Sequence, residues 1–276
     1  MANQLNNWKN IIWPIRNDWG GWGTGFLVKK ESNLANGTIG IRFFLVTNKH
    51  VVGEDPKDRR QREEITVFVR INTDKSKSSR KRAVIPMVDT IGTRTWKEHP
   101  DNNVDVLAVD VSPLIFQNMQ IAHDALTQAS FVNDQFIDDF QIITGDDVVV
   151  IGYPDFDGDR TIEPIITAGT LATRIGEPLI EYIAESNLKS TRGFLINHVT
   201  VPGSSGSPVI LKPTVGRTVR GKNYLGLEVP PLLLGIVAQT RHAKVKASVF
   251  EGRAFAGIGL AFDAVAIQET IDLFFD

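Results

Sequence analysis

Three residues of the chain lie in settings that suit nucleophilic catalysis. His50 follows an apolar run in FLVTNKHVV (44–52), Asp105 lies in NNVDVLAVDV (102–111), and Ser205 lies in GSSGSP (203–208). Acyl transfer by a serine requires the hydroxyl, a base that takes its proton, and an anion that orients the base. We therefore take His50, Asp105 and Ser205 as candidate catalytic residues, in the chain order His, Asp, Ser.

The segment VPGSSGSPVI (201–210) could be a flexible linker or a rigid turn that presents one serine. Linkers of this composition usually lead into a polar spacer. Here apolar runs flank the glycines and serines on both sides, FLINHVTV (194–201) before and VIL (209–211) after. The sequence therefore predicts a turn between two strands inside a folded body.

The elements that must position these residues are mostly short strands separated by turn residues, which predicts an all-β protein. ITVFVRI (65–71) alternates cleanly and places Ile65, Val67, Val69 and Ile71 on one face. Asn36-Gly37 is a hairpin signal. Further strands are expected within 24–30, 41–48, 103–111, 147–154, 164–173, 181–186, 232–239 and 254–262.

We expect three parts in the chain. Residues 1–112 would form an N-terminal arm and a first β body carrying His50 and Asp105. Residues 113–141, where helix formers and acids replace β-branched residues, would form a connector. Residues 142–276 would form a second β body carrying Ser205, and Asp263 would cap a final helix with Ile267, Ile271 and Phe274 on one face.

Composition narrows the function classes. The chain has 276 residues, 42% hydrophobic content and a net charge of −2, so we expect neither a nucleic-acid partner nor a membrane surface. Cysteine is absent, which excludes disulfides and thiolate chemistry. The N-terminus lacks the apolar core of a secretory signal, and we expect a cytoplasmic protein. Neither a metal nor any other cofactor is expected.

The residues around the three candidates resemble the trypsin-like, chymotrypsin-fold serine peptidases, especially their disulfide-free bacterial branch. The histidine context Thr47-Asn48-Lys49-His50-Val51-Val52 matches that family, and Asp105 matches its strand-opening aspartate. Gly203, Ser205, Gly206 and Pro208 match its GxSGxP turn. GTGFLV (23–28), VIGYP (150–154), LLGIV (233–237) and GIGLAF (257–262) are similar to further strands of the family.

This resemblance implies two antiparallel six-stranded β-barrels followed by a C-terminal helix, with the active site between the barrels. It implies a serine endopeptidase in which Ser205 attacks the peptide carbonyl, His50 transfers the proton and Asp105 orients His50. The backbone N–H groups of Gly203 and Ser205 would form the oxyanion hole. An α/β-hydrolase fits poorly, because its elbow needs glycine at Ser207 and its triad runs serine, acid, histidine.

Departures from the family pattern bear on specificity and activation. Val199 stands where Lys- or Arg-cleaving relatives carry a negative charge, and Val237 stands where Glu-cleaving relatives carry a histidine. We expect a small or medium apolar side chain before the cleaved bond. Ser204 replaces the aspartate that pairs with a new N-terminus in secreted members, which disfavours that route of activation. The residues expected to bind substrate are Val199, Thr200, Val237, Ala238 and Gly257.

Other readings of these residues stay open. The chain could be a latent or degenerate protease that binds peptides, or a peptidase gated by an activating or regulatory protein partner. Asp101 and Asp110 compete with Asp105 for the role of the anion. DFDGDR (155–160) and the basic run 70–82 are expected to be solvated turns rather than a calcium loop or an RNA site. The remaining histidines, expected to be structural, are His99, His123, His198 and His242.

Overall fold

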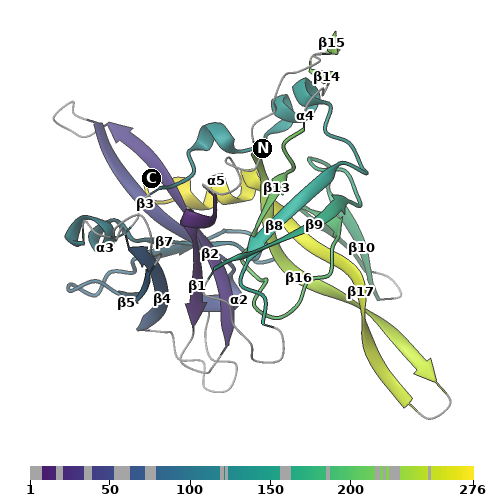
Figure 1. Cartoon of the computed structure of the whole chain (residues 1–276), viewed down its shortest axis with the longest axis horizontal. Coiled ribbons are helices and arrows are strands. Elements are labelled where there is room, and N and C mark those ends of the chain that lie inside the picture. The colour runs from purple at the N-terminus through teal and green to yellow at the C-terminus, as the bar shows by residue number, and fades with distance from the viewer. Residues whose placement is uncertain are drawn as a thin grey trace.

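The strands form two separate hydrogen-bonded bodies that lie side by side (Figure 1). The computed structural model describes residues 8–16, 21–33, 39–52, 63–71, 79–118, 121, 124–155, 163–184, 187–214, 218–219, 222–223, 231–247 and 250–276. The Asn36-Gly37 turn, His123, most of the basic run and most of DFDGDR lie outside these residues. The all-β prediction is confirmed, and helices are short.

The first body is a curled, antiparallel, seven-stranded sheet in the order β5-β4-β1-β2-β3-β7-β6. A one-turn helix, α2 (Lys49–Val52), follows β3 and carries His50. In β4, three of the four residues predicted to share one face, Ile65, Val67 and Val69, are buried, and the side chain of Ile71 lies outside the described residues. The strands are β1 (Ile12–Arg16), β2 (Trp22–Asn33), β3 (Ile39–Thr47), β4 (Glu64–Ile71), β5 (Ser79–Pro86), β6 (Trp96–Glu98) and β7 (Leu107–Asp110).

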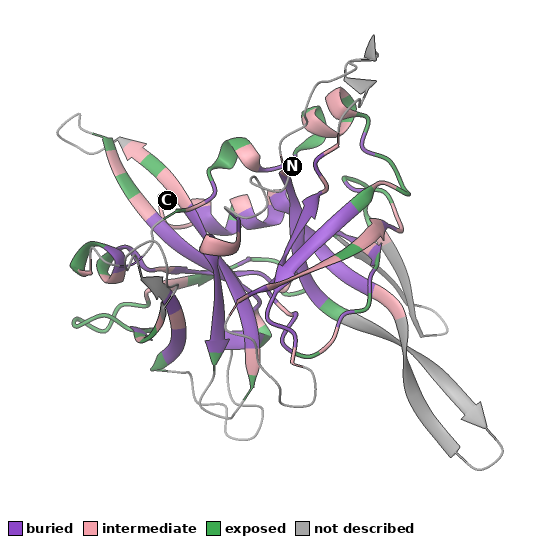
Figure 2. Ribbon diagram, in the orientation of Figure 1, coloured by how far each residue is buried: buried purple, intermediate pink, exposed green. Residues whose placement is uncertain are grey.

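The second body is a closed six-stranded barrel in the order β12-β17-β16-β13-β8-β9. Its strands are β8 (Asp147–Gly152), β9 (Ile165–Leu171), β12 (Gly193–Asn197), β13 (Pro208–Leu211), β16 (Leu232–Ala247) and β17 (Phe250–Asp263). Two small hairpins, β10 (Leu179–Ala184) with β11 (Asn187–Thr191) and β14 (Thr218–Val219) with β15 (Lys222–Asn223), form separate sheets. Buried residues fill the inside of both bodies (Figure 2).

The segment between the two bodies is helical in part. It contains α3 (Ser112–Gln117), the 3-10 helix η1 (Gln128–Ser130) and α4 (Asp134–Phe140). The last helix, α5 (Ala264–Asp272), follows β17 directly, and Asp263 caps it by accepting a hydrogen bond from the Ala266 N–H, as predicted. Ile267 and Ile271 on this helix are fully buried.

Beyond α5 the chain packs against the first sheet, so the C-terminal segment connects the two bodies (Figure 1). The ring of Phe274 lies 4.8 Å from the ring of fully buried Phe44 in β3. The Arg42 guanidinium lies over the same two rings and donates to the backbone carbonyl of Phe274. An ion pair between Lys30 and Asp272 closes the contact.

Two features of the first body differ from expectation. It has seven strands rather than six, and its end strands β5 and β6 do not pair with each other along the described residues. The additional strand, β1, arises from the N-terminal arm and contains Pro14, which normally marks an edge. Pairing of β1 with β4 covers only Ile15 and Arg16, so the proline is not required to donate on that side.

Thr24, a fully buried residue of β2, joins the first sheet to the second barrel. Its backbone N–H donates to the carbonyl of Ser205 at 2.8 Å. Its hydroxyl donates to the carbonyl of Gly203 at 2.8 Å and accepts the N–H of Tyr153, just after β8, at 3.0 Å. Its carbonyl accepts the hydroxyl of Thr47 at 2.8 Å. We call this set of contacts the Thr24 junction.

We predict that Thr24→Val lowers the free energy of unfolding by about 2–4 kcal/mol, because the valine removes the buried hydroxyl that binds the Gly203 carbonyl and the Tyr153 N–H. Thr24→Ser keeps the hydroxyl and should cost no more than about 1 kcal/mol, roughly the value of one buried methyl group. Denaturant unfolding of both variants measures the difference. Equal stability of the valine and serine variants would contradict the junction.

Candidate active site

The structure brings His50 and Asp105 together. The Nδ1 atom of His50 lies 2.5 Å from Oδ2 of Asp105, and the backbone N–H of His50 donates to Oδ1 at 3.2 Å. The carboxylate therefore binds both the ring and the backbone of the histidine. Because Nδ1 carries the shared hydrogen in this arrangement, Nε2 keeps its lone pair and can accept a proton. Half of the His50 side chain is exposed.

Strand pairing places Asp105 beside the histidine. β7 pairs with the end of β3 in a register that sets Leu107 opposite Thr47. The Asn48 side chain then donates to the backbone carbonyl of Asp105 at 2.7 Å. His50 and Asp105 are 55 residues apart in the sequence, and the ends of two neighbouring strands hold them together.

The competing aspartates are occupied by other partners. Asp101 accepts the backbone N–H of Asn103 at 2.8 Å, and this hydrogen bond lowers the pKa of the Asp101 carboxyl. Asp110 pairs with Arg42 at 2.5 Å. Neither carboxylate has a hydrogen bond to His50 in the described part of the chain, so the geometry favours Asp105 as the anion.

Ser205 lies in a rigid turn between β12 and β13. The N–H groups of Ser204 and Ser207 donate within the turn, to Val201 at 3.0 Å and to Ser204 at 3.0 Å, and the N–H of Gly206 donates to Val237 at 2.9 Å. Over the residues that the structure describes, the N–H groups of Gly203 and Ser205 have no acceptor. Two backbone donors of one turn are therefore available to an oxyanion.

The two glycines of the turn cannot be replaced without distortion. Gly203 has a φ of 86°, and a Cβ there would lie 2.3 Å from the Tyr153 carbonyl oxygen. Gly206 also has a φ of 86°, and a Cβ there would lie 1.9 Å from the Thr24 carbonyl oxygen. Positive φ and close backbone contact both require glycine. The segment is a packed turn, as predicted, and not a flexible linker.

The Ser205 turn contacts the end of β3, just before α2, the helix that contains His50. A Cβ on Gly206 would lie 2.7 Å from the hydroxyl oxygen of Thr47, three residues before His50. No hydrogen bond joins the Ser205 hydroxyl to His50 within the described residues. Such bonds are often long before substrate binds. The structure therefore joins His50 to Asp105 directly, and it joins the Ser205 turn to the end of β3, the strand that leads into His50.

Most of the residues expected to bind substrate lie around this turn. Thr200, Val237 and Ala238 are buried, whereas Val199 is 60% exposed. Val237 contacts the turn through the hydrogen bonds that it makes with Gly206 and Ser207. Beyond Gly257 and its chain neighbours, no described atom lies within 4 Å of the position that a Cβ on Gly257 would occupy.

His198 and His99 are buried and hydrogen-bonded, as expected for structural histidines. Burial lowers the pKa of His198, whose Nε2 lies 2.6 Å from the hydroxyl oxygen of Thr167. No group of three or more potential metal ligands occurs among the described residues. Along the same residues no helix is long and apolar enough to cross a membrane.

Thr24, Asn48 and Lys49 also contribute side-chain hydrogen bonds to the site, and no sequence pattern assigned them that role. The available signal for Thr24 was its position between Gly23 and Gly25. A Cβ on Gly23 would lie 2.5 Å from Val51, and a Cβ on Gly25 would lie 2.8 Å from Leu45. Flanking glycines of this kind indicate a strand that other chain segments approach closely.

Comparison with solved structures finds crystal structures of the Rv3671c protease, at low similarity. The inactive form of the Rv3671c protease is 17% identical, with a TM-score of 0.46 over 98% of this chain and 93% of that chain. The active form of the same protease from M. tuberculosis is also 17% identical, with a TM-score of 0.44 over 98% of this chain and 83% of that chain. A search of curated proteins finds no match.

The family comparison covers more than half of the chain. Residues 23–215 match the trypsin-like peptidase domain. The matched region includes His50, Asp105 and Ser205 together with the Thr24 junction. The chain belongs to the trypsin-like peptidase family of serine proteases.

Proposed function

We propose that this protein is a serine endopeptidase that cleaves protein substrates through an acyl-enzyme, with His50, Asp105 and Ser205 as its catalytic triad. One observation carries the proposal. The Asp105 carboxylate binds Nδ1 and the backbone N–H of His50, which leaves Nε2 as the proton acceptor at the end of the strand that contacts the Ser205 turn.

The proposed reaction proceeds in two halves. The Ser205 oxygen attacks the substrate carbonyl while its proton moves to Nε2 of His50, and Asp105 stabilises the resulting imidazolium. The N–H groups of Gly203 and Ser205 bind the developing oxyanion. His50 returns the proton to the leaving amine, and an acyl-enzyme forms. Water then attacks the ester with the same proton transfers, which releases the acid and restores Ser205.

We further propose a preference for a small or medium apolar residue before the cleaved bond. Thr200, Val237 and Ala238 are buried beside the turn and carry no charge that could pair with a lysine, arginine or glutamate of the substrate. A buried site without a counter-charge penalises such side chains.

Reaction with a fluorophosphonate at pH 7–8 tests the nucleophile. We expect labelling of the intact protein and complete loss in Ser205→Ala, because only the Ser205 oxygen would be activated. The matched control is Ser204→Ala, which alters a buried serine of the same turn and should retain labelling. Failure of the intact protein to react would instead favour a latent form that awaits a partner, or a peptide-binding module.

Asp105→Asn tests the anion. The asparagine amide would donate to Nδ1 and place the ring hydrogen on Nε2, so kcat should fall by roughly 10³–10⁴-fold with little change in KM. The control is Asp110→Asn, five residues along, whose carboxylate pairs with Arg42. We expect its kcat to stay within about threefold of the original, because replacing an ion pair remote from the reacting atoms removes little transition-state stabilisation. A larger loss in the Asp110 variant than in the Asp105 variant would exchange the two assignments.

A peptide library that varies the residue before the cleaved bond tests the preference. The expected kcat/KM is at least about tenfold higher for alanine, valine or leucine than for lysine, arginine or glutamate, because the charged side chains lose hydration without gaining a partner. Cleavage mainly after a charged residue would show that the pocket is formed by residues other than these.

A further inference from the structure

Three consecutive residues at the start of α2 bind the same loop of the first body. This loop, residues 99–106, leaves β6 and carries Asp105 near its far end. Asn48 donates to the Asp105 carbonyl at 2.7 Å, and the His50 N–H donates to the Asp105 carboxylate at 3.2 Å. Lys49, between them, donates from Nζ to the carbonyls of His99 at 2.8 Å and Asp101 at 3.2 Å. The loop is therefore held at both ends.

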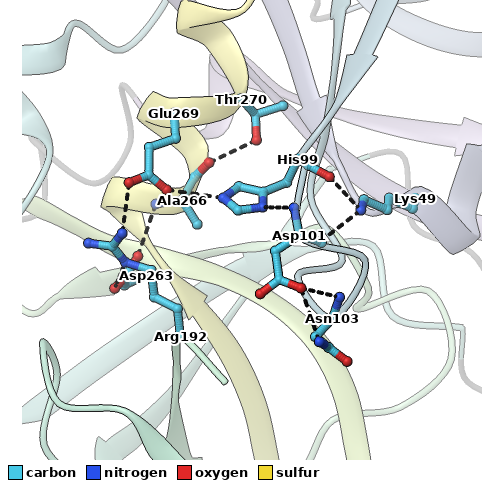
Figure 3. Close-up of polar contacts among 9 residues, drawn as sticks. All are labelled: Lys49, His99, Asp101, Asn103, Arg192, Asp263, Ala266, Glu269 and Thr270. Carbon is cyan, nitrogen blue, oxygen red and sulfur yellow. Dashed lines mark hydrogen bonds and ion pairs between the residues drawn. The ribbon is translucent and has the colours of Figure 1, made fainter. Parts of the chain in front are cut away.

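The backbone that carries the two carbonyls bound by Lys49 is also bound by the ring of His99 (Figure 3). The side chain of His99 is only 7% exposed, and its Nδ1 accepts the backbone N–H of Asp101 at 3.1 Å. Because Nδ1 is an acceptor, the hydrogen of the neutral ring lies on Nε2. Nε2 then donates to the Glu269 carboxylate on α5 at 3.0 Å.

Glu269 links this loop to the second barrel. Its other oxygen accepts Nη1 of Arg192 at 2.7 Å, and Nε of Arg192 donates to Asp263 at 3.0 Å (Figure 3). Burial raises the pKa of Asp263, while the charge of Asp263 raises the pKa of Arg192 against the opposing effect of burial. A continuous set of polar contacts thus runs from the N-cap of α5 to the loop that carries Asp105.

We propose that Lys49 is a positioning residue for the His50–Asp105 pair, and that α5 holds its acceptors in place through Glu269 and His99. Lys49 binds the start of the loop and Asn48 binds its end, so the Asp105 carboxylate cannot pivot away from the His50 ring. Both acceptors of the Lys49 ammonium are backbone carbonyls, so its hydrogen bonds hold the backbone of the loop. This inference rests on the proposed triad.

Kinetics of two substitutions test the inference. Lys49→Met keeps the length of the side chain and removes the donor, and we expect kcat to fall roughly tenfold with KM within about twofold. Lys49→Arg, which retains donors, should recover most of kcat. The matched control is Lys212→Met. The Lys212 ammonium pairs with Asp147 at the start of β8, whereas Tyr153 and the Thr24 junction lie just after the end of that strand, so the kcat of this variant should match the original. A kcat for Lys49→Met equal to that of the control would overturn the inference.

A spectroscopic readout that needs no turnover separates this inference from the proposed function. The Nδ1 hydrogen shared by His50 and Asp105 should give a downfield proton resonance in the full-length protein. We expect a sharp signal in the original, Lys49→Arg and Glu269→Gln proteins, since glutamine can still accept from His99. The signal should broaden or disappear in Lys49→Met and in Glu269→Leu.

The outcomes of the two experiments are distinct. An unchanged resonance in Lys49→Met, with an inactive Ser205→Ala, would refute the positioning role and leave the triad intact. A resonance that responds to Lys49 in a protein that never reacts with fluorophosphonate would support the positioning role and count against activity of the protein alone, in favour of a latent form or a peptide-binding module. Thermal unfolding of each variant identifies any that lose the signal merely because they fail to fold.

Discussion

The buried hydroxyl of Thr24 is the constraint on which the arrangement of the site depends. The strands of the first sheet and of the second barrel pair within each body, so bonding between the two bodies must come from other groups. Thr24 supplies such bonding, because a single residue binds the Ser205 carbonyl, the Gly203 carbonyl and the Tyr153 N–H. Gly203 and Tyr153 are buried, and an interior polar group left without a partner is costly. The two bodies can therefore meet in few ways, and the observed one requires the turn at Gly206 to approach the Thr24 backbone without a side chain.

The end of β3 connects the Thr24 junction to the candidate catalytic residues. Thr47 binds the Thr24 carbonyl, and the next three residues bind the loop that carries Asp105. One short segment thus contacts the serine turn on one side and the aspartate loop on the other. Residues 47–50 form this segment, which explains why a single helical turn follows the strand: the chain must bend at once for Asn48, Lys49 and His50 to face the same loop.

Sequence patterns predicted the family, the fold class and many of the strands, because these depend on local composition. The TNKHVV and GSSGSP segments, the alternation of Ile65, Val67 and Val69, and the Asp263 cap all signal their structure within a few residues. Long-range contacts leave weaker traces. The sequence did not predict β1, because proline is disfavoured inside strands and β1 contains Pro14. The strand tolerates this proline because β4 pairs with β1 only from Ile15 onward. The sequence motif favours Asp105 over Asp101 and Asp110, but the contacts that distinguish them are long-range: Asp105 binds His50, 55 residues away, and Asp110 pairs with Arg42.

The C-terminal helix connects stability with the geometry of the site in a chain that has no cysteine. α5 leaves the second barrel at Asp263, and the residues that follow it place Phe274 against Phe44 of the first sheet, under the Arg42 guanidinium. Burial of the helix on both bodies supplies the cross-connection that disulfides provide in other small β proteins. The same helix presents Glu269 to His99. Loosening the apolar packing of α5 would therefore also shift the Glu269 carboxylate, which accepts a hydrogen bond from the His99 ring. In this way the packing of the C-terminal segment is linked to the loop that carries Asp105.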